Sequence, residues 1–412
     1  EGLVATGFMD SGGFLQTECG VIDKEGKYID NSGMFGIPVP DPLPFPDNIE
    51  TIDKEVIWGG RIFLHYGHFL LQSTTRLYQY IKNKEKNPYI VFTIGSGEKL
   101  PKFAVDFFDL LEIPKDRIIL IDKWTRFKKI ICPSLSSITR YQASAKLSSE
   151  NFWDWTDDFV LPFRAAAKKV EPSKHKKVYF TRRYWTGIAQ CLGESDVEKV
   201  FIKNGFKSFA PEKLSLREQI ALIKGADVIA GINGSPFHTA LFADKPNLKL
   251  IMLNRNEEFD YQYIVNEIIK ADWYVVKAYA SPFEVSESLG PFIIGMTQYL
   301  KNFCRDHKFK NFDIELNTAK YLKDFCYLYV KVYSEEYSLR TLECTGKGQV
   351  NARDLIAVIE TANYSLLKRA VYYALYHLTF GALKVKYRNR HRALEMFADY
   401  KKTASGAFGR IQ

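Results

Sequence analysis

The sequence lacks any apolar run long enough to cross a bilayer as a helix, which takes about 20 residues, and no signal peptide is visible in it. Its six cysteines are widely dispersed and include no Cys-x-x-Cys pair, so nothing indicates a zinc site or a dithiol motif. Internal repeats and low-complexity tracts are also missing. These absences argue against a membrane-spanning or disulfide-scaffolded protein, and they favour a reducing cytoplasm as the location.

What the sequence does contain is a large apolar content and a basic charge balance. Hydrophobic residues make up 46% and aromatic residues 15% of its 412 positions, which is ample for the cores of more than one domain. The formal net charge of +9 suits a partner that is polyanionic, carries a nucleotide or forms a membrane surface. No nucleic-acid-binding motif is present, so we expect no nucleic-acid partner.

The stretch from Pro211 to Phe242 organises the rest of the chain. Ser215 and Glu218 have the spacing of a capping box, and a helical apolar period follows at Leu216, Ile220 and Ile223. We expect Gly225 to end this helix and residues 226–230 to form a buried parallel strand.

A tight turn at Gly231, Gly234 and Ser235 then precedes a second helix that carries His238. A strand, a glycine turn and a helix start place free N–H groups and the positive end of a helix dipole at one point, which predicts a phosphate site. The alternative is a plain strand-to-helix connection whose glycines serve geometry alone.

A second polar pattern lies in residues 58–81. Gly59 and Gly60 predict a turn, and a helix is expected from about His65. His65, His68 and Gln72 recur at intervals of three and four, so they share one helical face, and Arg76 continues the row. Such a row is either a functional patch or a solvated helix face.

Strand and helix patterns alternate between residues 88 and 160 and again from 177 to 280, which predicts parallel sheets. The strand at Lys177–Arg183 delivers Thr181, Arg182 and Arg183 to its carboxyl end, where ligands of such sheets bind. Arginine chelates phosphate through its planar fork, although two surface arginines would give the same pattern.

These stretches together resemble glycosyltransferase family 61, in its bacterial capsule and polysaccharide branch. The family pattern Gly-x-x-Gly-Ser-Ala-x-His-x-x-x-Phe is matched by Gly231, Gly234, Ser235, His238 and Phe242. Its histidine motif, followed by an arginine, is matched by His65, Gly67, His68, Phe69, Leu70, Leu71 and Arg76. A third group of similar positions comprises Thr181, Arg182, Glu194, Pro211 and Glu212.

The chain departs from the family pattern at three places. Pro236 replaces a small residue, Gly193 replaces an asparagine, and Gln72 stands where the family commonly carries a carboxylate. An amide cannot take a proton as a general base. Either that position is not the base in this chain, or the chain carries an altered site.

The resemblance implies an α/β, GT-B-like fold, in which two Rossmann-like domains face a cleft, here with a helical C-terminal region. We place the N-terminal acceptor-side domain at residues 1–165, the nucleotide-sugar (donor) domain at 175–280 and the helical region at 281–412.

The resemblance also implies an inverting glycosyltransferase that moves a sugar from a nucleotide-sugar to a growing bacterial surface polysaccharide. Among the site residues we expect catalytic roles for His68, Gln72 and His65, with His68 as the favoured base. Arg76 is the expected acceptor-binding residue. The expected donor-binding residues are Arg182, Arg183, Glu194, Gly234, Ser235, His238 and Glu212.

No Asp-x-Asp pair lies in a metal-site context, so we expect no metal ion and no other cofactor. Arginine and a helix dipole would stabilise the leaving diphosphate instead. Two other hypotheses remain: a non-catalytic glycan-binding or scaffold protein on the same fold, which Gln72 favours, and an isomerase acting on nucleotide-sugars.

The last part of the chain combines aromatic and basic residues. A group of tyrosines, Tyr372, Tyr373 and Tyr376, precedes a basic segment that carries Lys384, Lys386, Arg388, Arg390 and Arg392. This composition suits peripheral contact with an anionic membrane surface, whereas packing against the first domain or contact with a glycan or glycolipid acceptor are the alternatives. We expect a cytoplasmic location, at the inner face of the cytoplasmic membrane if that contact forms.

Overall fold

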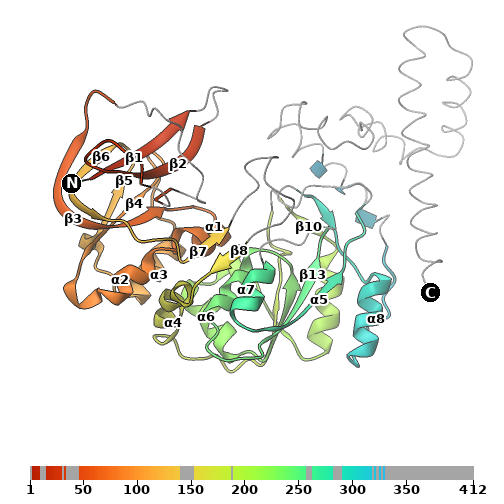
Figure 1. Cartoon of the computed structure of the whole chain (residues 1–412). Coiled ribbons are helices and arrows are strands. Elements are labelled where there is room, and N and C mark those ends of the chain that lie inside the picture. Colours follow the sequence, from red (N-terminus) through yellow and green to blue (C-terminus); the bar gives the residue numbers. More distant parts are fainter. Residues whose placement is uncertain are drawn as a thin grey trace, which may run out of the picture.

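The computed structural model describes residues 2–9, 15–29, 32–33, 46–139, 153–186, 189–256, 262–281 and 290–317, with short pieces at 320–321, 324–325 and 328–329. Two β-sheets with parallel strands stand side by side, and helices cover both faces of the second sheet (Figure 1). The expected mixed α/β class is thereby confirmed. In the described part of the chain, no helix is long and apolar enough to cross a bilayer.

The first sheet has the strand order β2-β1-β6-β3-β4-β5. Its strands are β1 (Gly2–Met9), β2 (Leu15–Ile22), β3 (Glu50–Arg61), β4 (Tyr89–Thr93), β5 (Ile118–Ile121) and β6 (Thr125–Ile131). Strands β6, β3, β4 and β5 are mutually parallel, whereas β1 and β2 form an antiparallel edge. Because β6 returns to the far side of β3, the strand order reverses between these two strands. Ligands of open α/β sheets bind at the carboxyl ends of such strands.

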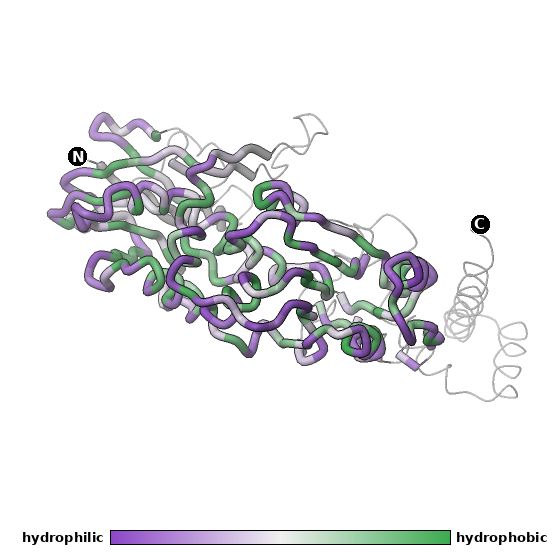
Figure 2. Tube along the Cα trace, turned by 90° about the horizontal axis from the view of Figure 1, so that it is seen from below, coloured by the Kyte–Doolittle hydropathy of each residue, from purple (hydrophilic) through white to green (hydrophobic). Residues whose placement is uncertain are grey.

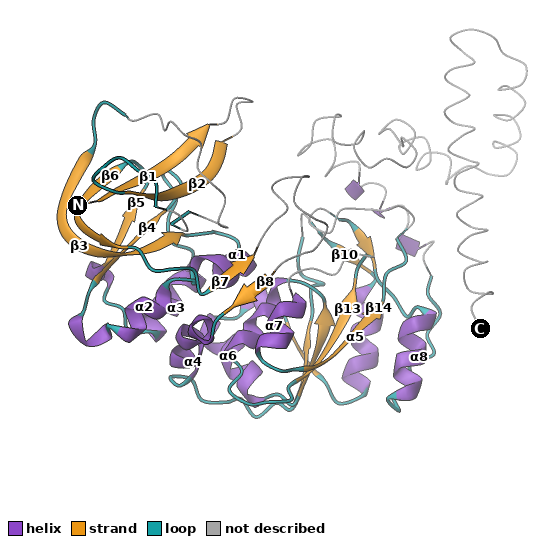
Figure 3. Cartoon of the chain, viewed as in Figure 1, coloured by secondary structure: helices purple, strands orange, loops and turns teal. Residues whose placement is uncertain are grey.

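The second sheet is entirely parallel, in the order β11-β9-β12-β13-β14. Its strands β13 and β14 lie side by side (Figure 3). Its strands are β9 (Lys177–Phe180), β11 (Lys207–Phe209), β12 (Val228–Ile232), β13 (Lys249–Asn254) and β14 (Asp272–Lys277). Here the order reverses between β9 and β12. Two small sheets pair β7 (Ser137–Thr139) with β8 (Trp153–Trp155) and β10 (Cys191–Leu192) with β15 (Phe292–Ile293).

The helices follow the local signals of the sequence. Ser215 accepts a hydrogen bond from the Glu218 N–H, and the Glu218 carboxylate accepts one from the Ser215 N–H, so the predicted capping box of α6 is confirmed. The α-helices are α1 (Tyr66–His68), α2 (Leu77–Lys82), α3 (Lys102–Leu110), α4 (Leu161–Ala167), α5 (Glu194–Lys203), α6 (Leu216–Gly225), α7 (Gln262–Ile268) and α8 (Gln298–Asp306). A π-helix, η1, spans Phe69–Ser73. The 3-10 helices are η2 (Lys84–Lys86), η3 (Lys115–Arg117), η4 (Asp157–Val160), η5 (Pro211–Lys213) and η6 (Ser235–Phe242).

One hydrophobic core continues from the first half of the molecule into the second. Phe107, Phe163 and Phe242 come from α3, α4 and η6, and their ring centroids lie 5.2 to 5.6 Å apart. Apolar segments run through the interior of both halves, while polar segments follow the outer turns (Figure 2). Aromatic packing of this kind adds to the free energy gained from burial, so the two halves are joined by a packed interface.

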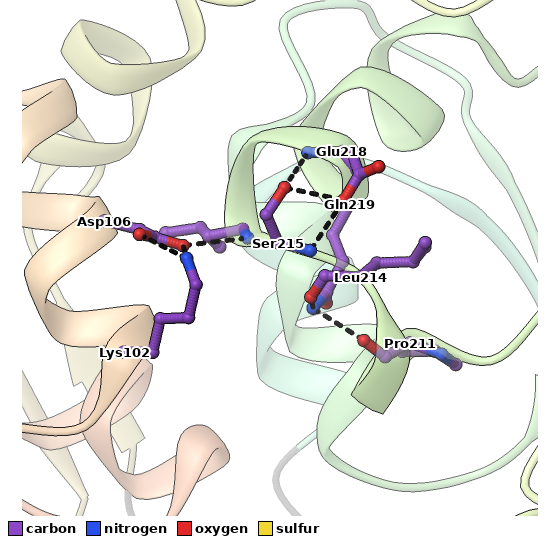
Figure 4. Close-up of polar contacts among 8 residues, drawn as sticks. Lys102, Asp106, Pro211, Leu214, Ser215, Glu218 and Gln219 are labelled. Atoms are coloured by element: carbon purple, nitrogen blue, oxygen red, sulfur yellow. Dashed lines mark hydrogen bonds and ion pairs between the residues drawn. The ribbon is translucent and has the colours of Figure 1, made fainter.

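Polar contacts at both ends of α6 reinforce this interface. The Leu216 N–H donates to Asp106 of α3 at 3.4 Å, and Asp106 also pairs with Lys102 (Figure 4). A carboxylate beside a helix N-terminus is favourable because it meets the positive end of the dipole. At the other end, the Lys224 ammonium donates to the carbonyls of Ala167 and Val170 at 2.8 Å each. The helix that precedes the glycine turn is therefore fixed against the first half.

Several local predictions were wrong, and each has a physical reason. No strand is predicted from the sequence for residues 2–9, but β1 and β2 pair with each other and β1 pairs with β6, a long-range contact that no local signal announces. Around Gly26 the chain turns back on itself: the Asp23 N–H donates to the Lys27 carbonyl, the Ile29 N–H donates to the Val21 carbonyl, and Ile22 forms a bridge with Tyr28.

The single helix expected from His65 is also wrong. It breaks into α1, η1 and α2, and the Thr74 hydroxyl donates to the Leu70 carbonyl at 2.7 Å, a back-bond that bends helices. Gly225, in contrast, is the last residue of α6, as predicted. A Cβ there would lie 2.1 Å from the Ser173 carbonyl oxygen, so the glycine permits a close chain crossing.

Two further predictions concern helices. The helix predicted after Gly234 does form, as the 3-10 helix η6, whereas Phe292–Ile293 forms a strand where a helix was expected. Most of the C-terminal helical region lies outside the described residues, together with its aromatic and basic positions Tyr372, Tyr373, Tyr376, Lys384, Lys386, Arg388, Arg390 and Arg392.

Candidate active site

The glycine turn after β12 lies where the strand order of the second sheet reverses. Gly234 has a φ of 150°, a conformation that L side chains rarely adopt. A Cβ at this position would lie 3.4 Å from Arg182 Nη1 and 3.7 Å from Arg255 Nη1. The absence of a side chain therefore lets two guanidinium groups, from the ends of β9 and β13, approach the turn together.

Glu194 fixes the backbone of Arg182. Both of its carboxylate oxygens accept from the Arg182 N–H at 3.0 Å, and the Tyr179 hydroxyl donates to it at 3.2 Å. Burial raises the pKa of Glu194 to about 7, against the opposing effect of these hydrogen bonds. Glu194 therefore supports the strand end, and its role in donor binding stays a prediction.

The Arg182 side chain has donor capacity left for an anion. Its Nε is buried and has no hydrogen-bond partner among the described residues. A buried donor without a partner costs free energy, so an arginine in this state is suited to a bound anion.

Arg183 and Glu212 are placed differently from Arg182. Arg183 is exposed and pairs with Glu198 of α5 at 3.0 Å, and it also contacts the Tyr184 hydroxyl. Glu212 is exposed on η5. Both therefore stay predictions as donor-binding residues.

The first half contributes a pair of histidines from the end of β3. The rings of His65 and His68 meet edge to face with centroids 5.0 Å apart. His68 Nδ1 lies 2.8 Å from Gln72 Oε1. The structure thus brings together the three residues predicted as a row, although π-helical winding replaces the expected α-helix between them.

Helix α1 packs directly on η6, so the two predicted patches meet. A Cβ on Gly67 would lie 2.7 Å from Ser235 Oγ and 2.9 Å from His238 Cδ2. The Tyr66 and Thr239 hydroxyls are hydrogen-bonded across the same contact at 2.8 Å. Glycine is thus required at position 67 by the approach of the second half.

The pKa of His65 reflects the closeness of basic groups from both halves. The pKa of His65 is lowered to about 4, first by desolvation and then by repulsion from His68, His238, Arg182 and Arg255. His65 is therefore neutral at physiological pH, although part of its ring is open to solvent. Five basic side chains converge on this junction of the two halves, where an anion would be stabilised.

His238 is buried, with 4% of its surface exposed, and its Nδ1 lies 2.7 Å from Gln262 Oε1. Ser235 begins the same 3-10 helix, with its hydroxyl facing Gly67. Both residues therefore lie at the junction on one helix, η6, and their contact with the donor stays a prediction.

Arg76 has a structural environment. Only 2% of it is exposed, and it donates from Nε to the Pro133 carbonyl and from Nη2 to the Gly33 carbonyl, at 3.2 and 3.0 Å. It ties the segment at Gly33, between β2 and β3, to the loop that follows β6. These loops line a pocket whose walls are Cys19, Gly33, Gly60, Arg61, Phe63, Leu71, Gln72, Thr75, Arg76, Leu135 and Ser137.

This pocket lies at the reversal of strand order in the first sheet and is next to the histidine pair. Gln72 belongs to both, since it lines the pocket and contacts His68. Among the described residues, the walls of the pocket include two arginines and no carboxylate.

The sequence analysis missed Arg255 and Gln262. Arg255 directly follows β13, and Arg182 lies two positions after the end of β9. The argument that ligands bind at the carboxyl ends of strands therefore applies to Arg255 as well. For Gln262 no local signal exists, because only the packing of α7 brings it to His238. In the described residues no group of three or more His, Cys, Asp or Glu side chains is arranged to hold a metal ion.

A family model described as Glycosyltransferase 61 matches residues 66–251, a range that contains His68, Arg182 and the glycine turn. The match supports this family and glycosyl transfer as the activity. No curated protein matches the chain.

Two solved structures show a distant likeness. One is the dodecameric iron-containing heptosyltransferase TibC in complex with ADP-D-beta-D-heptose, with 13% identity over 62% of this chain and 73% of that chain and a TM-score of 0.25. The other is the bacterial iron-containing dodecameric glycosyltransferase TibC from enterotoxigenic E. coli H10407, with 11% identity over 63% and 75% and the same TM-score. At that TM-score neither likeness bears on the site.

Proposed function

We propose that this protein is an inverting, metal-independent glycosyltransferase of GT-B arrangement, which moves a sugar from a nucleotide-sugar to a bacterial surface polysaccharide. The observation that carries the proposal is the junction itself, where Arg182 and Arg255 approach the Gly234 turn opposite the histidine pair. The family match over residues 66–251 supports the sugar-transfer class.

The donor diphosphate binds at the glycine turn. The guanidinium groups of Arg182 and Arg255 supply charge and hydrogen bonds, and Ser235 adds a hydroxyl at the start of η6. As the bond between the anomeric carbon and the diphosphate breaks, negative charge grows on the leaving oxygen. The arginines are already in place to meet it.

His68 acts as the general base. Gln72 Oε1 accepts from Nδ1–H, which leaves Nε2 to take the proton of the acceptor hydroxyl. The hydroxyl oxygen then attacks the anomeric carbon from the side opposite the diphosphate, so one bond forms as the other breaks and the configuration inverts. His65 is the weaker candidate, because its lowered pKa makes it a poorer base.

The acceptor occupies the pocket at the ends of β3 and β6. Its neighbour Gln72 places the bound acceptor beside His68, and Arg61 and Ser137 offer polar contacts on its walls. Arg76 contributes by holding the Gly33 and Pro133 loops that shape the pocket. We assign the acceptor-side domain to residues 1–165 and the donor domain to 175–280.

The proposed location is the cytoplasmic face of the membrane, where polysaccharide acceptors are assembled. The net charge of +9 supports contact with anionic lipid. Co-sedimentation with anionic vesicles at low salt, abolished at high salt, is the expected result, and no sedimentation at low salt would contradict it.

A second candidate function is glycan binding without catalysis, and Gln72 is the observation that favours it. The deciding experiment incubates the protein with a panel of UDP-, GDP-, CMP- and ADP-sugars, with and without a glycan acceptor, and follows the products by mass spectrometry. Transfer or slow donor hydrolysis supports the enzyme. Glycan binding without turnover of any donor supports the alternative, and an altered sugar without acceptor would indicate an isomerase.

A further inference from the structure

Two buried side-chain amides on α7, Asn266 and Gln262, form a hydrogen-bonded series that ends at His238. Gln262 and Asn266 are fully buried at 0% exposure, one helical turn apart, and neither belongs to the motifs that predicted the site. Burial of an amide costs free energy unless its hydrogen bonds are made. Two adjacent buried amides on a short helix therefore call for a structural or functional reason.

The hydrogen bonds of this series all have the same donor-to-acceptor direction. The Asn266 amide nitrogen lies 3.7 Å from the Met252 sulfur, the Gln262 nitrogen lies 2.7 Å from Asn266 Oδ1, and Gln262 Oε1 lies 2.7 Å from His238 Nδ1. A thioether sulfur only accepts hydrogen bonds, so the asparagine must turn its NH2 group toward Met252. Its oxygen then accepts from Gln262, whose own oxygen faces the histidine.

We infer that Gln262 and Asn266 are positioning residues that keep a proton on His238 Nδ1, so that Nε2 is the atom that meets the nucleotide-sugar. Since an amide oxygen can only accept, Nδ1 must donate in both the neutral and the protonated imidazole. Only Nε2 is then able to gain or lose a proton.

The orientation of the ring supports this role. Cδ2, which is bonded to Nε2, is the His238 atom nearest to the position of a Gly67 Cβ, at 2.9 Å. The Nε2 edge therefore faces the junction with α1, whereas Nδ1 faces α7. The identity of the ligand rests on the proposed function, but the tautomer does not.

The test uses the full chain with ¹⁵N-labelled histidine and two-bond ¹H–¹⁵N correlation spectra, which distinguish the two neutral tautomers and the imidazolium. The His238 signals are identified from their loss in His238→Gln. The expected spectrum shows the proton on Nδ1 and a pyridine-like Nε2. A His238 ring with its proton on Nε2 would overturn the inference.

Two variants and a matched control complete the experiment. Gln262→Leu removes the acceptor, so the Nδ1–H pattern should be lost, and KM for the nucleotide-sugar should rise or kcat fall. Gln262→Glu keeps an acceptor, so the pattern should persist while the added carboxylate shifts the His238 titration to higher pH. If Gln262→Leu fails to fold, Gln262→Glu still decides, because an unshifted His238 titration in that variant would contradict the contact.

The control is Gln298→Leu. Gln298 donates to Asn302 at 2.8 Å on α8 with the same spacing, but it is exposed and has no histidine partner. It should change neither the spectrum nor the kinetics. An unchanged tautomer in a folded Gln262→Leu variant would refute the positioning role, whereas the absence of turnover with every donor would refute only the proposed function.

Discussion

The two sides of the junction use the same residue types in opposite ways. In the first half Arg76 is buried and donates to backbone carbonyls, so its charge serves the loops around the pocket. In the second half Arg182 is only partly buried, its backbone is fixed by Glu194, and its Nε is without a hydrogen-bond partner in the described part of the chain. The two arginines thus differ in whether their guanidinium N–H groups already donate hydrogen bonds within the fold, and this difference separates a structural role from a ligand-binding role.

The histidines, in contrast, are supported alike. His68 and His238 lie on opposite sides of the junction, and each has Nδ1 within 2.8 Å of a glutamine oxygen. Both glutamines are neutral, so neither side places a carboxylate behind its imidazole. We therefore expect the two halves to use their arginines differently and to orient their histidine rings in the same way, through a glutamine oxygen at Nδ1.

The largest effect should come from removing the proposed base. His68→Ala should lower kcat by about 10²- to 10⁴-fold, the usual contribution of a general base, with nucleotide affinity unchanged. His65→Ala should cost less, because its pKa is already lowered. Steady-state kinetics and calorimetry check both, and full activity in a folded His68→Ala variant would remove His68 from the mechanism.

Arg182→Ala should weaken nucleotide binding by ~1.5–3 kcal/mol, the value of a charge-assisted hydrogen bond. Arg183→Ala is the matched control, because Arg183 is exposed and pairs with Glu198 instead of facing the turn. Calorimetry with the preferred nucleotide gives both affinities. An equal loss of nucleotide affinity in the two variants would contradict the assignment of different roles to Arg182 and Arg183.

Arg76→Met should act on stability first. It leaves the Gly33 and Pro133 carbonyls without their donor, which costs ~1–3 kcal/mol of unfolding free energy, measured in urea. Arg182→Ala should change unfolding much less. If Arg76→Met is as stable as the parent chain but has lost acceptor binding, Arg76 is a ligand-contacting residue as first predicted.

Gln72→Glu sharpens the comparison of the two histidines. A carboxylate behind His68 Nδ1 favours the imidazolium, which should move the acidic limb of the kcat profile to higher pH. Greatly raised turnover without such a shift would instead indicate that position 72 holds the base.

The smallest effects are pH-dependent and opposite on the two sides. The folded-state pKa of His65, about 4, lies below its unfolded value of 6.5, so its contribution to stability is complete above pH 6.5 and is lost as pH falls toward 4. The pKa of Glu194 is raised from 4.5 to about 7, so its contribution is complete below pH 4.5 and is lost as pH rises through 7. Urea unfolding of His65→Gln and Glu194→Gln across this range should remove one slope each, and unchanged slopes would contradict the assignment.

The sequence by itself determined the local units of this protein. The capping box at Ser215, the buried strands β12 and β13 and the strand-end Arg182 all follow from period, capping chemistry and turn residues within a few positions. The histidine row was predicted for the same reason, and its members do lie together. These signals depend on neighbours in the chain, so they survive without knowledge of the fold.

Only the tertiary structure decided which units meet. It added β1 and β2 to the edge of the first sheet, turned Arg76 inward, and placed Arg255 beside Gly234 and Gln262 behind His238. The need for glycine at positions 225 and 67 comes from residues that are distant in the sequence. Ser173 passes too close to Gly225 for a side chain there, and Ser235 and His238 pass too close to Gly67. Such contacts depend on how sheets and helices pack across the whole molecule, and no local pattern of residues encodes that packing.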